Sequence, residues 1–254
     1  MAAAATVRGG GGGGVRGGSS VATWLGLIVA FALGVLFSAS GLLADLQTYW
    51  PDIEFLAVQH IELVAISGSL AIVAGIGLGI FLSRPFMHRF AEPAMQVLNV
   101  GTTIPTLAIL ALSMSFLGIG TTPAIFALFI ASLLPIVRNT YAGLRAVPAH
   151  LKEAANGMGM SARTQLIRVE LPNALYVMFA GIRTALTINV GTVPLAFLIG
   201  GGGLGELIFT GIALNDFGMM LAGAIPTALL AILTDFIVAQ FQFWAIPRGV
   251  NPLR

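Results

Sequence analysis

Residues 153–159, with the sequence EAANGMG, are followed after nine residues by residues 169–172, VELP. Together they form a polar, charged island in a chain that is otherwise mostly apolar. E-A-A alone would indicate only an amphipathic helix with a glycine turn. Seven residues in fixed register indicate more, namely a specialised loop between membrane spans. They are Glu153, Ala154, Ala155, Gly159, Val169, Leu171 and Pro172.

The composition identifies an integral membrane protein. Of 254 residues, 57% are hydrophobic and 9% are charged, whereas a soluble domain carries about 25% charged residues. Bilayer spans of about 20 residues each occupy most of this length. The absence of cysteine excludes disulfides, thiolate metal sites and cysteine nucleophiles. The basic residues form no stripe, so no nucleic-acid partner is expected.

Apolar runs predict an all-α membrane protein with about six transmembrane helices. Eleven of the twelve Lys and Arg residues fall in the N-terminal tail, in residues 83–92 and 138–172, or after residue 246. An even number of spans places all of these segments on one side, which the positive-inside rule makes cytoplasmic, together with both termini. The runs lie near residues 22–43, 60–82, 94–116, 122–143, 174–199 and 218–243.

The chain divides into four predicted parts. Residues 1–20 are Ala- and Gly-rich and predict a disordered cytoplasmic tail. Residues 21–58 predict the first transmembrane helix and an external loop. The apolar run there is longer than the roughly 7 to 15 residues of a signal peptide, which favours a retained span over a cleaved one. Residues 59–245 predict the main transmembrane domain with its loop at 147–172, and residues 246–254 a cytoplasmic tail.

Five prolines interrupt the predicted spans and remove backbone donors: Pro105, Pro123, Pro135, Pro194 and Pro226. Kinks that only help packing are one interpretation. The other is a transport path, because irregular backbone at membrane depth is tolerated against protein or a water-filled cavity. On that interpretation, the kinked region around Pro105, Pro135, Pro194 and Pro226 lines a mostly apolar passage.

Charged and titratable residues argue against an enzyme. Arg183 and Asp235 are essentially the only clear charges inside the spans, at similar depth from the cytoplasmic ends. A structural pair between them is expected, with Arg183 bonded to carbonyls or to another subunit as the alternative. A membrane enzyme needs convergent titratable groups, and His60, His88 and His150 lack ligand spacing. We therefore expect no catalytic, metal-binding or cofactor-binding residues.

Residues 200–205, GGGGLG, formally contain G-x-G-x-x-G but follow a span rather than a strand, so they predict a tight external loop instead of a dinucleotide site. No G-K-S or G-K-T occurs, so the chain is not itself a P-loop ATPase.

The seven-residue pattern resembles the cytoplasmic loop of binding-protein-dependent ABC importer permeases. From about residue 55 to 245 the chain is similar to the osmoprotectant class, which imports glycine betaine, choline and carnitine. The stretches that carry this likeness are 103–108 (TIPTLA), 118–120 (GIG), 123–125 (PAI), 134–140 (LPIVRNT), 181–185 (GIRTA), 199–205 (IGGGGLG) and 222–226 (AGAIP).

The resemblance implies a type I ABC importer fold in a bacterial or archaeal cytoplasmic (inner) membrane. It implies two permease subunits, identical or paralogous, a cytoplasmic ATPase dimer and an external or periplasmic substrate-binding protein. ATP hydrolysis would then reside in the partner. The residues expected to couple to that ATPase are Glu153, Ala154, Ala155, Gly159, Leu171 and Pro172.

One departure leaves the substrate open. Osmoprotectant permeases more often read G-A-G-G where this chain has four glycines, and this run is also similar to methionine importers. An amino-acid importer of the methionine type is therefore the alternative. A scaffold that moves nothing is disfavoured by the loop pattern.

The loop at 147–172 is expected to alternate short helical pieces with glycine hinges. Glu153 is predicted to be exposed, and Ala154, Ala155 and Gly157 are small enough to permit close approach to a partner, with the charge fixing orientation. Pro172 is expected to stop one helix and let the next span begin at Asn173.

Overall fold

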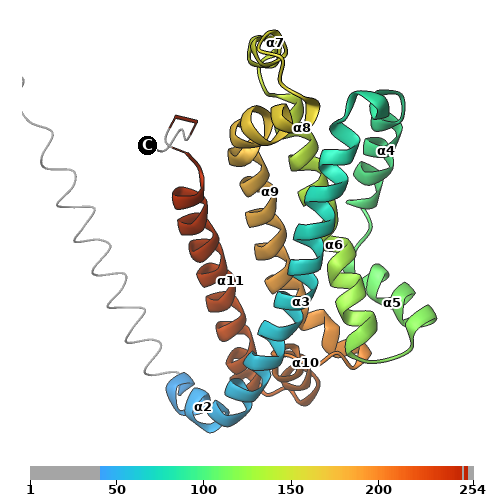
Figure 1. The fold of residues 1–254 in the computed structure, drawn as a ribbon. Coiled ribbons are helices and arrows are strands. Elements are labelled where there is room, and N and C mark those ends of the chain that lie inside the picture. Colours follow the sequence, from blue (N-terminus) through green and yellow to red (C-terminus); the bar gives the residue numbers. More distant parts are fainter. Residues whose placement is uncertain (1–40, 248, 251–254) are drawn as a thin grey trace, which may run out of the picture. The chain divides into compact units, whose positions relative to one another are not determined.

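Long apolar helices dominate the computed structural model, which describes residues 41–247, 249 and 250. The predicted tail, most of the first span and its possible cleavage site lie outside the described residues. Those described contain no strand. Four helices among them are long and apolar enough to cross a membrane (Figure 1): α3 (Trp50–Ser83), α6 (Thr121–Arg145), the continuous stretch Ala162–Ile199 and α11 (Phe217–Ala245). A short helix, α2 (Leu42–Thr48), precedes α3.

Helix α6 packs against both α3 and α9 (Leu171–Thr192), and glycines allow this close approach. A Cβ on Gly75 or Gly79 of α3 would lie 2.7 Å from Ile136 Cγ2 or 2.5 Å from Thr140 Cβ of α6. Glycines four residues apart let two transmembrane helices come into backbone contact. On the other side of α6, a Cβ on Gly181 of α9 would lie 2.5 Å from Asn139 Cβ. Substituting these glycines would push the three helices apart.

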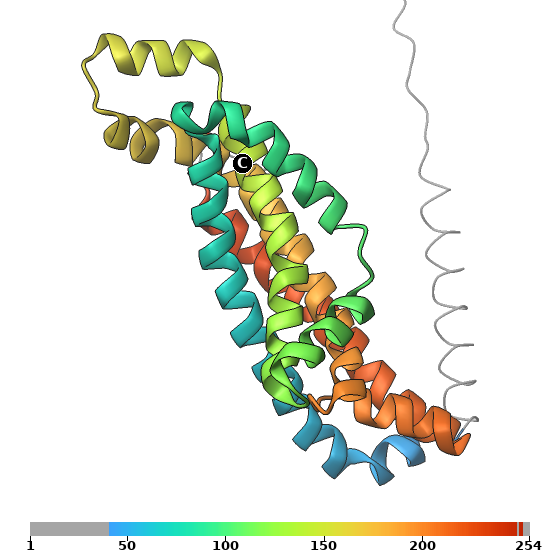
Figure 2. The ribbon, with the colours of Figure 1, turned by 90° about the vertical axis from the view of Figure 1, so that its right-hand side faces the viewer.

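The third predicted span is not one straight helix. Residues 94–116 fall on α4 (His88–Gly101) and α5 (Thr106–Leu117), which follow the 3-10 turn η1 (Pro85–Met87). The stretch Pro85–Gly101 and α5 are bent by 98° relative to each other. Figure 2 shows the break between α4 and α5. Pro105 has an extended conformation and begins α5. Thr102 and Thr103 donate to carbonyls of the last turn of α4 at 2.7 Å. These hydroxyls stabilise the helix end where Pro105 prevents continuation.

The fifth predicted span also changes character before it ends. Helix α9 is α-helical to Thr192 and continues as the 3-10 segment η3 (Val193–Ile199), with Pro194 in its first turn. The glycine run then turns sharply, with positive φ at Gly200, Gly202 and Gly203. This confirms the predicted tight loop, because only glycine adopts such φ values without strain. By contrast, Pro135 and Pro226 lie inside the continuous helices α6 and α11.

A short helix, α10 (Gly205–Leu214), connects the glycine loop to α11. Asp216 caps α11 by accepting from Met219 N–H at 2.8 Å, and it also accepts from Tyr49 Oη at 2.8 Å. The backbone hydrogen bond from Met219, aided by the one from Tyr49, lowers the pKa of this carboxyl group. The carboxylate therefore holds the start of α3 close to the start of α11.

One further acid, Glu62, lies within α3, near the start of the apolar run of that helix. This helix has 34 residues and begins at Trp50, ten residues before the apolar run. Its length of about 50 Å exceeds the roughly 30 Å hydrocarbon core of a bilayer. Glu62 lies 21 residues before Ser83, or about 32 Å along the axis. A span that begins near Ser83 therefore reaches its other boundary at Glu62.

Candidate coupling site

The loop singled out in the sequence forms a projection at one end of the long helices. Helix α7 (Ala149–Gly157) extends beyond the end of α6 (Figures 1 and 2). The chain returns through α8 (Ala162–Gln165) and the π-helical turn η2 (Leu166–Glu170) into α9. The projection therefore lies where α6 ends and α9 begins, beside the last residues of α3.

Backbone hydrogen bonds close α7 at its C-terminus. Met160 N–H donates to Ala155 O at 3.1 Å, and Gly159 N–H donates to Asn156 O at 2.9 Å. With Gly159 at φ +73°, this is the Schellman arrangement, in which a left-handed residue follows the last helical turn. The pattern glycine is thus required by backbone conformation, and Ala155 is buried beneath this turn.

The exposed face of α7 carries small side chains and one acidic residue. Glu153, Ala154, Gly157 and Met158 are exposed, Met158 by 68%. No atom lies within 4 Å of where a Gly157 Cβ would be. Among the described residues, Glu153 forms no ion pair. A partner surface can therefore approach the backbone of α7 closely and find a carboxylate there with free acceptor oxygens.

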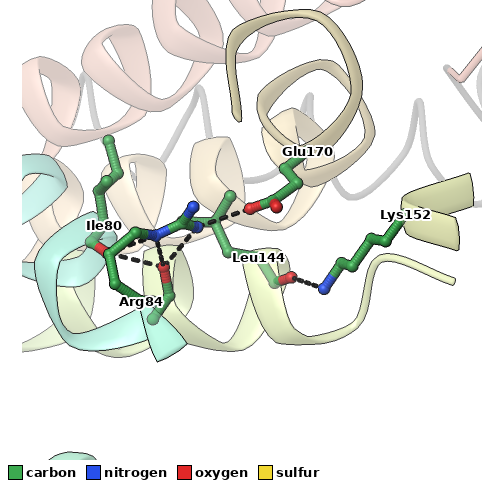
Figure 3. Close-up of polar contacts among 6 residues, drawn as sticks. Ile80, Arg84, Leu144, Lys152 and Glu170 are labelled. Carbon is green, nitrogen blue, oxygen red and sulfur yellow. Dashed lines mark hydrogen bonds and ion pairs between the residues drawn. The ribbon is translucent and has the colours of Figure 1, made fainter. Parts of the chain in front are cut away.

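Inner residues attach α7 to the long helices. Lys152 Nζ donates to Leu144 O in the last turn of α6 at 3.2 Å (Figure 3). Leu144 and Val147 are buried in an apolar cluster with Ala174 and Met178 of α9, and Leu151 of α7 packs against that cluster. Helix α7 is therefore attached to both α6 and α9.

A salt bridge joins the end of α3 to the start of α9. Arg84 Nη2 lies 2.6 Å from Glu170 Oε2, and the two side chains are only 18% and 9% exposed. Arg84 also donates to Ser83 Oγ and to Ile80 O, which fixes its orientation (Figure 3). This pair was not predicted from the sequence, because Glu170 occupies the unspecified position of the loop pattern. Its signal was that segment 138–172 contains five basic residues but only two acids, Glu153 and Glu170.

The role expected for Pro172 as a helix stop is wrong. The chain is helical without interruption from Ala162 to Ile199, and Leu171 and Pro172 lie in the first turn of α9. The preceding turn is π-helical, with Leu171 N–H donating to Leu166 O. A wider turn at this point accommodates the missing N–H of proline. Pro172 therefore shapes the helix instead of ending it.

Arg183 of α9 and Asp235 of α11 are in contact, joined by two hydrogen bonds from Nε and Nη2 to the two carboxylate oxygens. Their side chains are 42% and 35% exposed in a cleft of about 600 Å³ that Thr184, Thr187 and Gln242 also line. Charges within apolar spans are costly unless they are paired. Four prolines were predicted to line a passage, namely Pro105, Pro135, Pro194 and Pro226. They lie in different parts of the fold, and none of them borders this cleft.

The helical fold and its projecting loop define the class of membrane-spanning transport subunits. Residues 75–246 match the family of binding-protein-dependent transport system inner membrane components. The chain belongs to this family. It is a multi-pass inner-membrane transport subunit, not an enzyme, and its ATPase and substrate-binding protein are separate partners.

Named relatives agree with this assignment. The chain is 55% identical over 223 residues to the osmoprotectant import permease protein OsmY of Salmonella typhimurium, covering 88% of this chain and 94% of the relative. It is 40% identical to the choline transport system permease protein OpuBB of Bacillus subtilis, covering 82% and 95%. An inward-facing structure of the MetNI methionine ABC transporter matches with a TM-score of 0.69 at 22% identity, covering 77% and 96%, which establishes the fold alone.

The first prediction concerns the projecting helix. Glu153→Lys reverses the charge of the exposed face, and Gly159→Val forces a β-branched residue into the left-handed region, where L-residues are strained by about 1–2 kcal/mol. Both variants should insert into the membrane, while solute-stimulated ATP hydrolysis by the assembled importer falls at least about tenfold. Glu54→Lys, in the first turns of α3, is the control. Normal stimulation in both loop variants would show that α7 does not dock.

The second prediction concerns Arg84 and Glu170. Arg84→Gln or Glu170→Gln alone leaves a largely buried charge without its partner, which should destabilise the protein by about 3 kcal/mol. The double variant should lose less than the sum of the two, because neither charge remains. Thermal unfolding in detergent measures this, with the exposed Arg163→Gln as the control. Strictly additive losses would show that the two groups do not interact.

The third prediction concerns Arg183 and Asp235. Asp235→Asn removes the charge that balances Arg183 and should destabilise the protein by about 2 kcal/mol. Uptake should fall with it, whereas Glu206→Gln, which changes an exposed acid, should have little effect. If Asp235→Asn changes neither unfolding nor uptake, the contact makes no contribution to the working protein.

Proposed function

We propose that this chain is the permease subunit of an ATP-driven ABC importer for a quaternary-ammonium osmoprotectant such as glycine betaine or choline. The observation that carries the proposal is the 55% identity, over nearly the whole of both chains, to a permease named for osmoprotectant import. Likeness to the methionine transporter is at 22% identity and concerns the fold alone. The methionine-type alternative therefore has no comparable support.

In this proposal the ATPase binds the exposed face of α7. The carboxylate of Glu153 orients the contact, and Ala154 and Gly157 let the partner approach. Closure of the ATPase dimer then moves α7 as a rigid body. Two attachments support the transmission of this movement: Lys152 to the end of α6, and Arg84 to Glu170 between α3 and α9.

A second permease subunit, identical or paralogous, completes the proposed assembly, with an ATPase dimer on the cytoplasmic side and a binding protein outside. Two long helices of this chain, α9 and α11, border the cleft that contains Arg183 and Asp235. An isolated subunit leaves this pair partly exposed at membrane depth. A pairing of subunits that encloses the cleft between proteins, away from lipid, would reduce that cost.

Selectivity in the proposed importer resides mainly in the external binding protein. A quaternary ammonium is held tightly when two or more aromatic faces surround the cation. Among the described residues, aromatic rings contact one another in separate pairs, such as Phe179 with Phe241 and Phe197 with Phe209. In both pairs the rings pack on each other instead of opening around a cavity. The permease is thus suited to weak, transient contact with solute.

The fourth prediction tests the substrate and the location of selectivity. The isolated permease in detergent should show no micromolar affinity for glycine betaine or choline by calorimetry, whereas its cognate binding protein should retain a quaternary amine. The complete importer in proteoliposomes should accumulate that solute when ATP is enclosed. Tight binding by the permease alone would contradict the location of selectivity. A binding protein that retains methionine but no quaternary amine would contradict the substrate class.

A further inference from the structure

Two consecutive residues of α3 hold the two ends of η3. His60 Nε2 lies 3.0 Å from Val190 O, in the last α-helical turn before η3. Gln59 Oε1 accepts a hydrogen bond from Gly203 N–H at 3.1 Å, in the loop after η3. His60 is completely buried, with an exposed fraction of 0%. The 3-10 segment Val193–Ile199 is therefore held between two side-chain hydrogen bonds from one helix.

The bond from His60 replaces one that proline removes. Val193 N–H donates to Asn189 O, four residues earlier, as in an α-helix. The next donor in this series would be the N–H of residue 194, aimed at Val190 O, but proline has none. His60 supplies the missing donor. A buried carbonyl without a hydrogen-bond donor costs about 1–3 kcal/mol. The hydrogen bond from His60 therefore contributes to the stability of the junction between α9 and η3.

The same contact fixes the chemical form of the imidazole. Because a carbonyl only accepts, Nε2 must carry the proton. Nδ1 is buried and has no hydrogen-bond partner among the described residues. A proton on Nδ1 would be a buried donor without an acceptor. His60 therefore acts as a neutral donor with a fixed tautomer.

Neighbouring groups support this arrangement. At the preceding residue of α9, Asn189 Nδ2 donates to Ser67 Oγ at 2.9 Å, so a second polar contact joins α9 to α3, two turns further along α3. On the loop side, a Cβ on Gly202 would lie 2.5 Å from Gln59 Oε1. The glycine run thus leaves the space that the Gln59 contact needs.

We infer that His60 is a positioning residue for transport, which holds the last α-helical turn of α9 to α3 next to the break at Pro194. Motion from the coupling loop enters α9 at its first turn, next to Glu170. At Pro194 the α-helical hydrogen bonding of α9 ends. His60 holds Val190 before this break and Gln59 holds Gly203 beyond η3, so both ends of η3 keep their place against α3 when α9 moves. This inference rests on the transport role of the family, not on the identity of the solute.

A specific rescue is expected if His60 replaces the N–H that Pro194 lacks. His60→Leu removes the donor at similar volume, and solute uptake per ATP hydrolysed should fall about tenfold, the equivalent of one buried hydrogen bond lost. Pro194→Ala restores an N–H that can reach Val190 O. In the Pro194→Ala background, His60→Leu should therefore reduce uptake per ATP less than about twofold. His60→Gln, which keeps an N–H donor, should retain most of the activity.

The experiment uses the reconstituted importer, with thermal unfolding of each permease variant measured in detergent. Pro123→Ala is the control proline, since it should leave the His60→Leu defect unchanged. Equal losses from His60→Leu in the wild-type and Pro194→Ala backgrounds would overturn the inference, as would full activity of His60→Leu itself. If His60→Leu folds only together with Pro194→Ala, the inference is supported, and if it folds in neither background, the inference is wrong. If the wild-type importer transports no osmoprotectant, the proposed substrate is wrong. Thermal unfolding of the two single variants and the double variant then still tests whether residues 60 and 194 interact.

Discussion

Backbone hydrogen bonding within an apolar environment is the constraint on which this structure depends. In a bilayer, an unpaired carbonyl or N–H costs several kcal/mol, so each proline in a span needs a local remedy. At three prolines the chain uses three different remedies. Threonine hydroxyls cap α4 before Pro105, a π turn precedes Pro172, and His60 bonds the carbonyl that Pro194 leaves free. Irregular backbone is thus concentrated where other groups of the protein satisfy it.

Besides these remedies, close packing joins the long helices to one another and to the projecting loop. Glycines on α3 and α9 bring α6 into close contact with both helices, so the three form a tightly packed unit. The coupling loop is attached to the end of this unit through Lys152 and through Arg84 with Glu170. At its far end, the unit meets a segment that is no longer α-helical. Between α7 and η3, the contacts therefore run through these packed helices and then through the side-chain hydrogen bonds of His60 and Gln59, beside the continuous backbone of α9.

Local and periodic features of the sequence predicted a large part of this arrangement. Hydropathy located the spans because each must be long and apolar, and seven residues in register marked the segment that forms the projecting loop. Arg183 and Asp235 could be matched because charges are rare inside spans. Glu170 could not, since five basic residues of its own loop were equally good partners from spacing alone, and its actual partner, Arg84, lies 86 positions earlier. The sequence also did not reveal that the helix continues through Pro172, because the π turn that accommodates this proline depends on packing around η2.

His60 shows how a residue can be assigned no role from sequence and still be central to the structure. Its partner is 130 positions away, and the need that it meets arises from a missing atom in another residue, the amide hydrogen of Pro194. Neither residue carries a motif that refers to the other. Only the packing of α3 against the end of α9 brings donor and acceptor together. The same packing explains why α3 extends beyond Glu62, the expected boundary of the bilayer, since the residues just before Glu62 include the two that hold η3.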